Sequence, residues 1–354
     1  MTTTSARPDS GMLVRVSDPA QLIAAVPHLL GFRPADSVVV LGLGGASGQR
    51  IDPVLRADLP SCPGEEGAAE RLAAVFAQHS GRAVVIVIVG RGPGDPPGPG
   101  CLPYEEFVSG LGAALRRRGR PVDRALWTPE IQAGAPWASY GEPGRAGVVP
   151  DNSSSQVAAA AASMGFVTFE SRAALEGQLD PDDPAALARR ERLLEAEMDT
   201  LAARVVRDPG CAESFQELRM ALDQARYGPP KLSDEQMVRL GLALFEGPVR
   251  DTCLAAALPA GSERSMRAEA LWLALVRGLP APERAEPAAL LGHSAYVRGD
   301  GVLARAALEN ALAACPAHTL AELLMLCLEL ALPPDRLSRL HHPGDLGKLF
   351  GPPT

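Results

Sequence analysis

Six polar and aromatic side chains near the ends of predicted strands are the first candidates for chemistry in this sequence. They are Asp36, Ser37, Asp58, Arg91, Trp137 and Tyr140. Carboxylates and hydroxyls exchange protons and hydrogen bonds, an arginine pairs with anions, and aromatic rings cover apolar parts of a ligand. Because ligands bind at strand ends in open α/β sheets, these residues predict a ligand site. The alternative is structural, since Asp36 and Ser37 are also typical of turns and tryptophans of cores.

No catalytic residue can be assigned from the spacing. His28 and His79 lie in predicted helices without an HxxxH or HExxH partner, and a nucleophile needs a base beside it. The six cysteines form no CxxC pair, which favours reduced and mostly buried thiols. His341 and His342 have no further ligands near them. We therefore expect no metal and no cofactor, and a non-enzymatic protein is favoured over an enzyme.

Three other motifs have simpler structural explanations. The glycines between positions 42 and 48 place Ser47 at the third position of a GxGxxG register, and a strand follows, which predicts a hairpin turn. The loop from Gly90 to Gly100 follows a buried strand, but its prolines lack the N–H donors of a phosphate cradle. The basic run Arg116–Arg120 lies at a predicted helix C-terminus, where cations offset the helix dipole.

Length and charge limit the class of protein. A chain of 354 residues predicts two domains. The net charge of -8, from 42 acidic and 34 basic residues, repels phosphate backbones, so we expect no nucleic-acid partner. The longest apolar runs are far shorter than the roughly 20 residues that span a bilayer, and the N-terminus lacks a signal peptide's apolar core. We expect a cytoplasmic protein without a membrane partner.

The N-terminal half predicts an α/β domain over residues 12–178, after a disordered tail at 1–11. Strands are expected at 12–16, 38–41, 51–59, 83–89, 122–127 and 137–140, and helices at 65–79, at 104–118 and between Asp18 and Gly31. The run Ala83–Val89 is apolar at consecutive positions. Such a strand is buried on both faces, which predicts a mixed sheet with flanking helices on each side.

The C-terminal half predicts an all-α domain over residues 179–335, followed by a flexible tail at 336–354. The order Leu291-Gly292, Gly299-Asp300, Ala304, Leu308, Ala311 and Pro316 follows one tetratricopeptide (TPR) unit of about 34 residues. In this pattern Gly299 turns the chain between two antiparallel helices, and Ala304 lets the helices approach closely. Only one copy is clear, so the domain is predicted to be TPR-like, with neighbouring helices completing the stack.

Two features of this half are candidate contacts for a protein partner. The first is a helical stripe made of Leu187, Leu194, Met198, Leu201 and Val205. The second is the pair Arg250-Asp251 at a helix start, with Tyr296 in the TPR-like unit. If these residues form contacts, they predict a protein partner or self-association. The alternative is structural, with the stripe as part of a helix core and Arg250-Asp251 as an ion pair between hairpins.

Several segments together resemble the actinobacterial domain-of-unknown-function family 4192. They are Val26–Val40 with its LLGFxPxDS motif, Arg56–Pro60, Trp137 with Tyr140, Arg250-Asp251, Trp272 and Gly299–Pro316. The resemblance covers residues 12–334 and implies an actinobacterial, cytoplasmic protein with no established activity, so it adds no catalytic residue. Members often carry a Cys-Cys-Pro run after the Trp and Tyr motif. Residues 141–150 lack it, which argues against thiol or metal chemistry there.

Two functions remain open from the sequence. The favoured one is a non-enzymatic adaptor that binds a protein partner, or a second copy, through its helical-repeat domain. The alternative is a small-molecule-binding or hydrolytic α/β domain with a site at the strand ends.

Overall fold

The computed structural model of the chain describes residues 2–4, 18–44, 50–60, 67–79, 83–92, 101–151, 158, 167–207, 211–330, 332–338 and 349–350. The chain divides into two compact units. The α/β unit comprises Met1–Leu175 with Gly299–Val302 and Glu329–Pro333, and the helical unit comprises Glu176–Arg298, Leu303–Leu328 and Pro334–Thr354.

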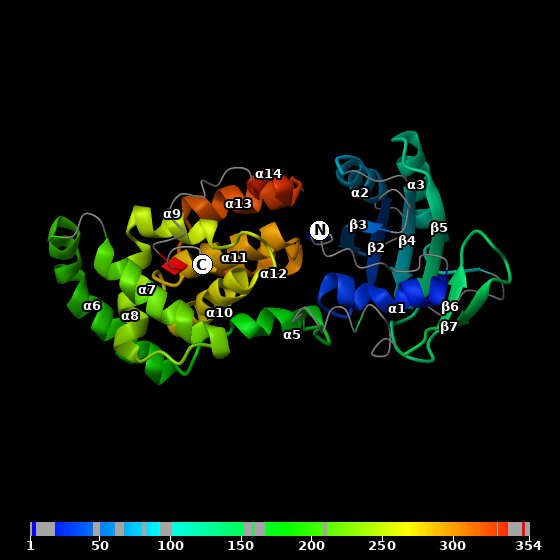
Figure 1. Ribbon diagram of the computed structural model, residues 1–354. Coiled ribbons are helices and arrows are strands. Elements are labelled where there is room, and N and C mark those ends of the chain that lie inside the picture. The colour runs from blue at the N-terminus through cyan, green and yellow to red at the C-terminus, as the bar shows by residue number, and fades with distance from the viewer. Residues whose placement is uncertain are drawn as a thin grey trace. The chain divides into compact units, whose positions relative to one another are not determined.

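The α/β unit is built on a mixed sheet with the strand order β1-β3-β2-β4-β5-β6-β7 (Figure 1). The strands are β1 (Thr2–Thr4), β2 (Ser37–Gly44), β3 (Arg50–Asp58), β4 (Ala83–Val89), β5 (Val122–Thr128), β6 (Pro136–Ser139) and β7 (Ala146–Val148). Only the pair β4 and β5 is parallel among these neighbours. The antiparallel pairing of β2 with β3 confirms the predicted hairpin, and Gly42 and Gly44 lie inside β2.

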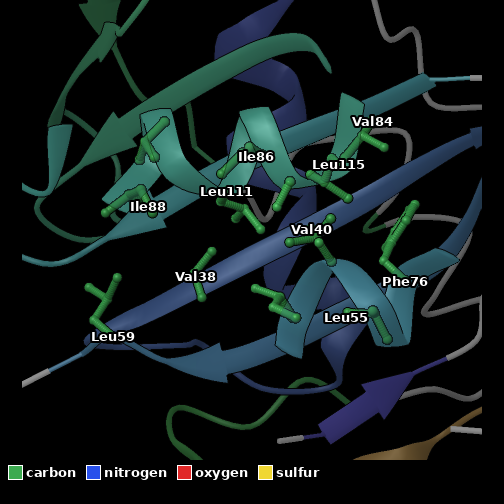
Figure 2. Close-up of a cluster of buried hydrophobic side chains, with 14 residues drawn as sticks. Val38, Val40, Leu55, Leu59, Phe76, Val84, Ile86, Ile88, Leu111 and Leu115 are labelled. Carbon is green, nitrogen blue, oxygen red and sulfur yellow. The ribbon is translucent and has the colours of Figure 1, made fainter. Parts of the chain in front are cut away.

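The core of this unit lies between the sheet and its helices. Alternate side chains of β2 and β4, such as Val40 and Ile86, pack against α2 (Ala68–Ala77) and α3 (Glu105–Arg117), as Figure 2 shows. The dark-blue helix behind the sheet in Figure 2 is α1 (Pro19–Leu30), and side chains of the opposite face, such as Val85, are fully buried. The predicted cover on both faces of β4 is therefore confirmed.

Local signals set the helix ends in this unit. The side chain of Asp18 accepts a hydrogen bond from the amide of Ala20 at 2.9 Å, Pro19 occupies the first turn, and Gly31 ends α1 with φ +82°. Helix α2 begins at Ala68, later than the predicted Glu65. The expected strand at 12–16 lies outside the described residues.

The helical unit is formed by helices separated by Pro and Gly turns (Figure 1). Their bounds are α6 (Pro184–Arg207), α7 (Ala212–Gln224), α8 (Asp234–Leu244), α9 (Gly247–Ala255), α10 (Glu263–Gly278), α11 (Ala285–Arg298), α12 (Gly301–Ala314), α13 (Thr319–Glu329) and α14 (Pro334–Ser338), and the short α5 (Arg172–Glu176) precedes them. A capping box begins α8, because Ser233 and Gln236 exchange side-chain-to-backbone hydrogen bonds there. Within the described part of the chain, every helix is too short or too polar to cross a bilayer.

Helices α11 and α12 approach each other closely. A Cβ atom on Gly292 would lie 2.8 Å from Cγ of Leu308 and 3.4 Å from the carbonyl oxygen of Ala304. Gly299, between the helices, has φ +86°, a conformation that favours glycine. The predicted turn and the close helix approach are both present, and α13 follows after Pro316.

Candidate functional site

Three of the six predicted ligand residues lie together at one edge of the sheet. Ser37 at the start of β2 is paired in register with Asp58 at the end of β3 and with Val89 at the end of β4. Asp36 precedes Ser37, and its Oδ1 would lie 3.1 Å from a Cβ atom placed on Gly90. The antiparallel register thus positions Asp36, Ser37 and Asp58 around the carboxyl end of the central strand.

A buried arginine connects these residues. Arg56 of β3 is 6% exposed, and its Nε donates to Oγ of Ser37 at 2.8 Å. Its Nη2 lies 2.6 Å from Oδ1 of Asp58. Burial lowers the pKa of Arg56 and the nearby charge of Arg172 lowers it further, whereas Asp58 and Asp36 oppose the shift. Because a guanidinium stays protonated in proteins, this edge holds a fixed buried cation beneath exposed carboxylates.

Two residues of this edge have the left-handed backbone conformation that side chains disfavour. They are Asp36, with φ +43°, and Tyr104, with φ +60°, which directly precedes α3. Burial raises the pKa of Tyr104, and the negative charge of Asp36 raises it further. Tyr140 contributes to the same edge, because its hydroxyl donates to the carbonyl of Pro103 at 2.6 Å and burial raises its pKa. Left-handed residues of this kind often accompany binding sites.

With Tyr140 at this edge, Arg91 and Trp137 are the two predicted ligand residues that do not join it. Arg91 has a side chain that is 78% exposed and pairs with Glu130 at 3.3 Å. Trp137 of β6 is buried beneath β7, where a Cβ atom on Gly147 would lie 2.9 Å from its Nε1. Trp137 is therefore a core residue. Among the described residues, His, Cys, Asp and Glu side chains form no group of three or more that could hold a metal ion.

The basic run at the end of α3 has internal partners. Arg117 and Arg118 both pair with Glu70 of α2, the second at 2.7 Å. Arg120 donates to the carbonyl oxygens of Ala77, at the end of α2, and His79. These contacts support the structural explanation of the run, which joins α3 to α2.

The predicted interaction stripe of α6 contributes a core residue at Leu194. Leu194 is 3% exposed and packs against Val238 and Leu242 of α8, whereas Leu187 is half-buried. The side chains of Met198, Leu201 and Val205 lie outside the described residues. Tyr296 of α11 is also buried, and its hydroxyl donates to the carbonyl of Cys327 in α13 at 2.8 Å. Leu194 and Tyr296 are thus corrected to core residues, since neither has a surface to offer to a partner.

Arg250 and Asp251 belong to a charged cluster between helices. Nη2 of Arg250 lies 3.1 Å from Oδ1 of Asp251, and its Nη1 lies 3.8 Å from Oε1 of the buried Glu286 in α11. Nε2 of His318, in the turn before α13, lies 3.4 Å from the same oxygen. This cluster ties α9, α11 and that turn together, as the structural interpretation of the pair predicts.

The outward face of α13 carries exposed leucines. Its inward side chains are buried, with Ala321, Leu324 and Leu328 at most 5% exposed. Leu323 and Leu326, on the other side, are 57% and 51% exposed. The outward leucines of α13 were not singled out from the sequence, because they lie in a run from Leu320 to Leu330 that is interrupted only by Glu322 and Glu329.

Comparison with known proteins adds a family and no activity. Residues 19–335 match the family described as a domain of unknown function, DUF4192. No curated protein and no solved structure matches the chain.

Proposed function

The chain belongs to the DUF4192 family, whose description assigns no activity, and we propose that it is a non-enzymatic adaptor in the cytoplasm that binds a protein partner through its helical unit. The observation that carries this proposal is the outward face of α13, where Leu323 and Leu326 are more than half exposed. Burying one leucine side chain completely stabilises a complex by about 1.5–3 kcal/mol. Because each of the two side chains is about half exposed, covering both by a partner would contribute roughly as much as one such burial.

The position of α13 in its unit supports the same proposal. We propose that the α11–α12 hairpin and α13 are the end of a TPR-like stack within a helical domain over residues 179–335, after an α/β domain over 12–178. In helical repeats the last helix needs a polar outer face to remain soluble. The outer face of α13 is only partly polar, because Leu323 and Leu326 are exposed beside Glu322 and Glu329. An additional layer, supplied by another protein, would complete the stack.

A matched pair of double variants tests the adaptor function. Leu323→Asp with Leu326→Asp places charge on the α13 face, and Met220→Asp with Met266→Asp alters two other exposed apolar side chains, which are 51% and 46% exposed. The proteins that co-purify with each double variant from the native lysate are then quantified. We expect at least one protein to fall by roughly tenfold with the α13 variant and to be retained with the control. An unchanged profile for a folded α13 variant would overturn the adaptor function.

A second candidate function is supported by the α/β unit. Asp36 and Tyr104, both in the left-handed conformation, lie at the sheet edge where Arg56 is buried, which favours a small-molecule site at these strand ends. A thermal-shift screen against nucleotides and metabolites tests it, because a ligand that binds only the folded state raises the melting temperature. If the ligand binds at this edge, an Asp36→Asn variant should lose the rise in melting temperature. A rise that persists in this variant would show that the ligand binds elsewhere.

A further inference from the structure

Two glutamates flank the exposed leucines of α13. Successive residues of an α-helix are separated by about 100° around its axis. On this basis Glu322 and Glu329 lie on one edge of the row formed by Leu323 and Leu326, and both are exposed. The other edge carries Leu320 and Cys327, which are half-buried and uncharged. The face is therefore an apolar row with a negative border along one side.

The charge of this border selects the kind of partner. Residues 319–329 contain no lysine or arginine, so the helix does not neutralise its own glutamates. A negative border repels nucleic acid and anionic lipid surfaces, and it attracts basic side chains. We infer that the segment that covers α13 is an amphipathic helix with an apolar stripe and flanking Lys or Arg residues. This inference rests on the proposed adaptor function.

A second copy of α13 fits the same face poorly. When two identical helices pair antiparallel, equivalent edges face each other. Glu322 of one copy would then lie near Glu329 of the other, and like charges at this separation destabilise the pair. Parallel pairing sets the glutamate edge against Leu320 and Cys327, which offer no positive charge. The charges therefore favour a different, basic partner over self-association.

Designed peptides test this inference on the full chain. The probe is a labelled synthetic helix of about 18 residues with leucines at i, i+3, i+4 and i+7 and lysines on both edges. One control peptide carries glutamates in place of the lysines, and another carries the same residues with the leucines scrambled. In fluorescence anisotropy at low salt, we expect the lysine peptide to bind roughly tenfold more tightly than the glutamate peptide. Added salt should reduce this difference.

Substitutions in the protein make the test reciprocal. Glu322→Lys with Glu329→Lys changes only exposed side chains and should reverse the preference, so that the glutamate peptide binds more tightly. Leu323→Asp with Leu326→Asp should weaken binding of the lysine peptide, and circular dichroism checks that this variant folds. A preference that persists after the charge reversal would overturn the inference.

The remaining outcomes separate this inference from the adaptor function. Equal binding of the lysine and glutamate peptides refutes the basic partner but leaves α13 as an interaction face. If no peptide binds and the leucine substitutions still remove a cellular partner, the partner is not a basic helix and the adaptor function stands. If the cellular partner is retained after the leucine substitutions, the adaptor function itself fails.

Discussion

Asp58 is exposed, yet the arginine that it neutralises is buried. Oδ1 of Asp58 lies 2.6 Å from Nη2 of Arg56, and the two side chains are 72% and 7% exposed. Asp251 offers a close comparison, because its side chain is 68% exposed and lies 3.1 Å from Arg250, whose side chain is 36% exposed. The two pairs differ mainly in how deeply the arginine is buried.

This difference predicts unequal costs for two surface substitutions. Asp58→Ala should lower the free energy of unfolding by about 1–3 kcal/mol, because it leaves a buried cation with less compensation. Asp251→Ala should change it by no more than about 0.5 kcal/mol, as for an ordinary surface pair. Urea unfolding of both variants measures the two costs, and equal small effects would contradict the role assigned to Asp58.

The close approach of α11 and α12 predicts that Gly292 tolerates no side chain. Gly292→Ala should lower the free energy of unfolding by about 1–3 kcal/mol, because the added Cβ would lie 2.8 Å from Leu308 in a packed core. Gly110→Ala in α3 is the control, since nothing lies within 4 Å of its added Cβ. Because alanine favours a helix more than glycine does, Gly110→Ala should raise the free energy of unfolding by about 0.5–1 kcal/mol. Thermal unfolding of both variants tests this prediction, and equal melting temperatures would argue against the close approach of α11 and α12.

His79 predicts a loss of stability in mild acid. Burial lowers the pKa of His79 below its ordinary value of 6.5, and the charge of Arg120 lowers it further. Protonation is then easier in the unfolded chain, so the stability contributed by neutral His79 is present above about pH 6.5 and is lost as the pH falls below that value. Between about pH 7.5 and about pH 5.5, the free energy of unfolding should fall more for the wild type than for His79→Gln. An equal or smaller fall in the wild type would show that His79 is not held neutral.

Much of the fold follows from local sequence signals. Asp18 and Gly31 bound α1, Ser233 begins α8, and the uninterrupted apolar run Ala83–Val89 becomes the central strand. These features depend on short-range chemistry and on burial of a whole segment. Strand β7 was not predicted, because Ala146–Val148 lacks a strand pattern and depends on its pairing with β6 over Trp137.

The candidate sites were harder to predict, because tertiary contacts decide the role of each residue. Ser37 and Asp58 were singled out as ligand candidates, but the arginine that contacts both of them was not, although a charged residue after the apolar pair Val54 and Leu55 was a signal. Tyr296 and Leu194 have the residue types of contact surfaces, and their burial depends on which helices pack against them. Leu323 and Leu326 were missed for the opposite reason. Periodicity predicts an apolar helix but does not indicate which side is left uncovered.

The most direct test of the account is site-specific photo-crosslinking at α13 in living cells of the native host. A photoreactive amino acid replaces Leu326 in one variant and Met220 of α7 in the other, since both side chains are 51% exposed. We expect a covalent adduct with a second protein from position 326, none from position 220, and loss of the adduct when Leu323→Asp is added. The absence of an adduct at position 326, or crosslinks only within the chain itself, would contradict the claim that α13 is an interaction face.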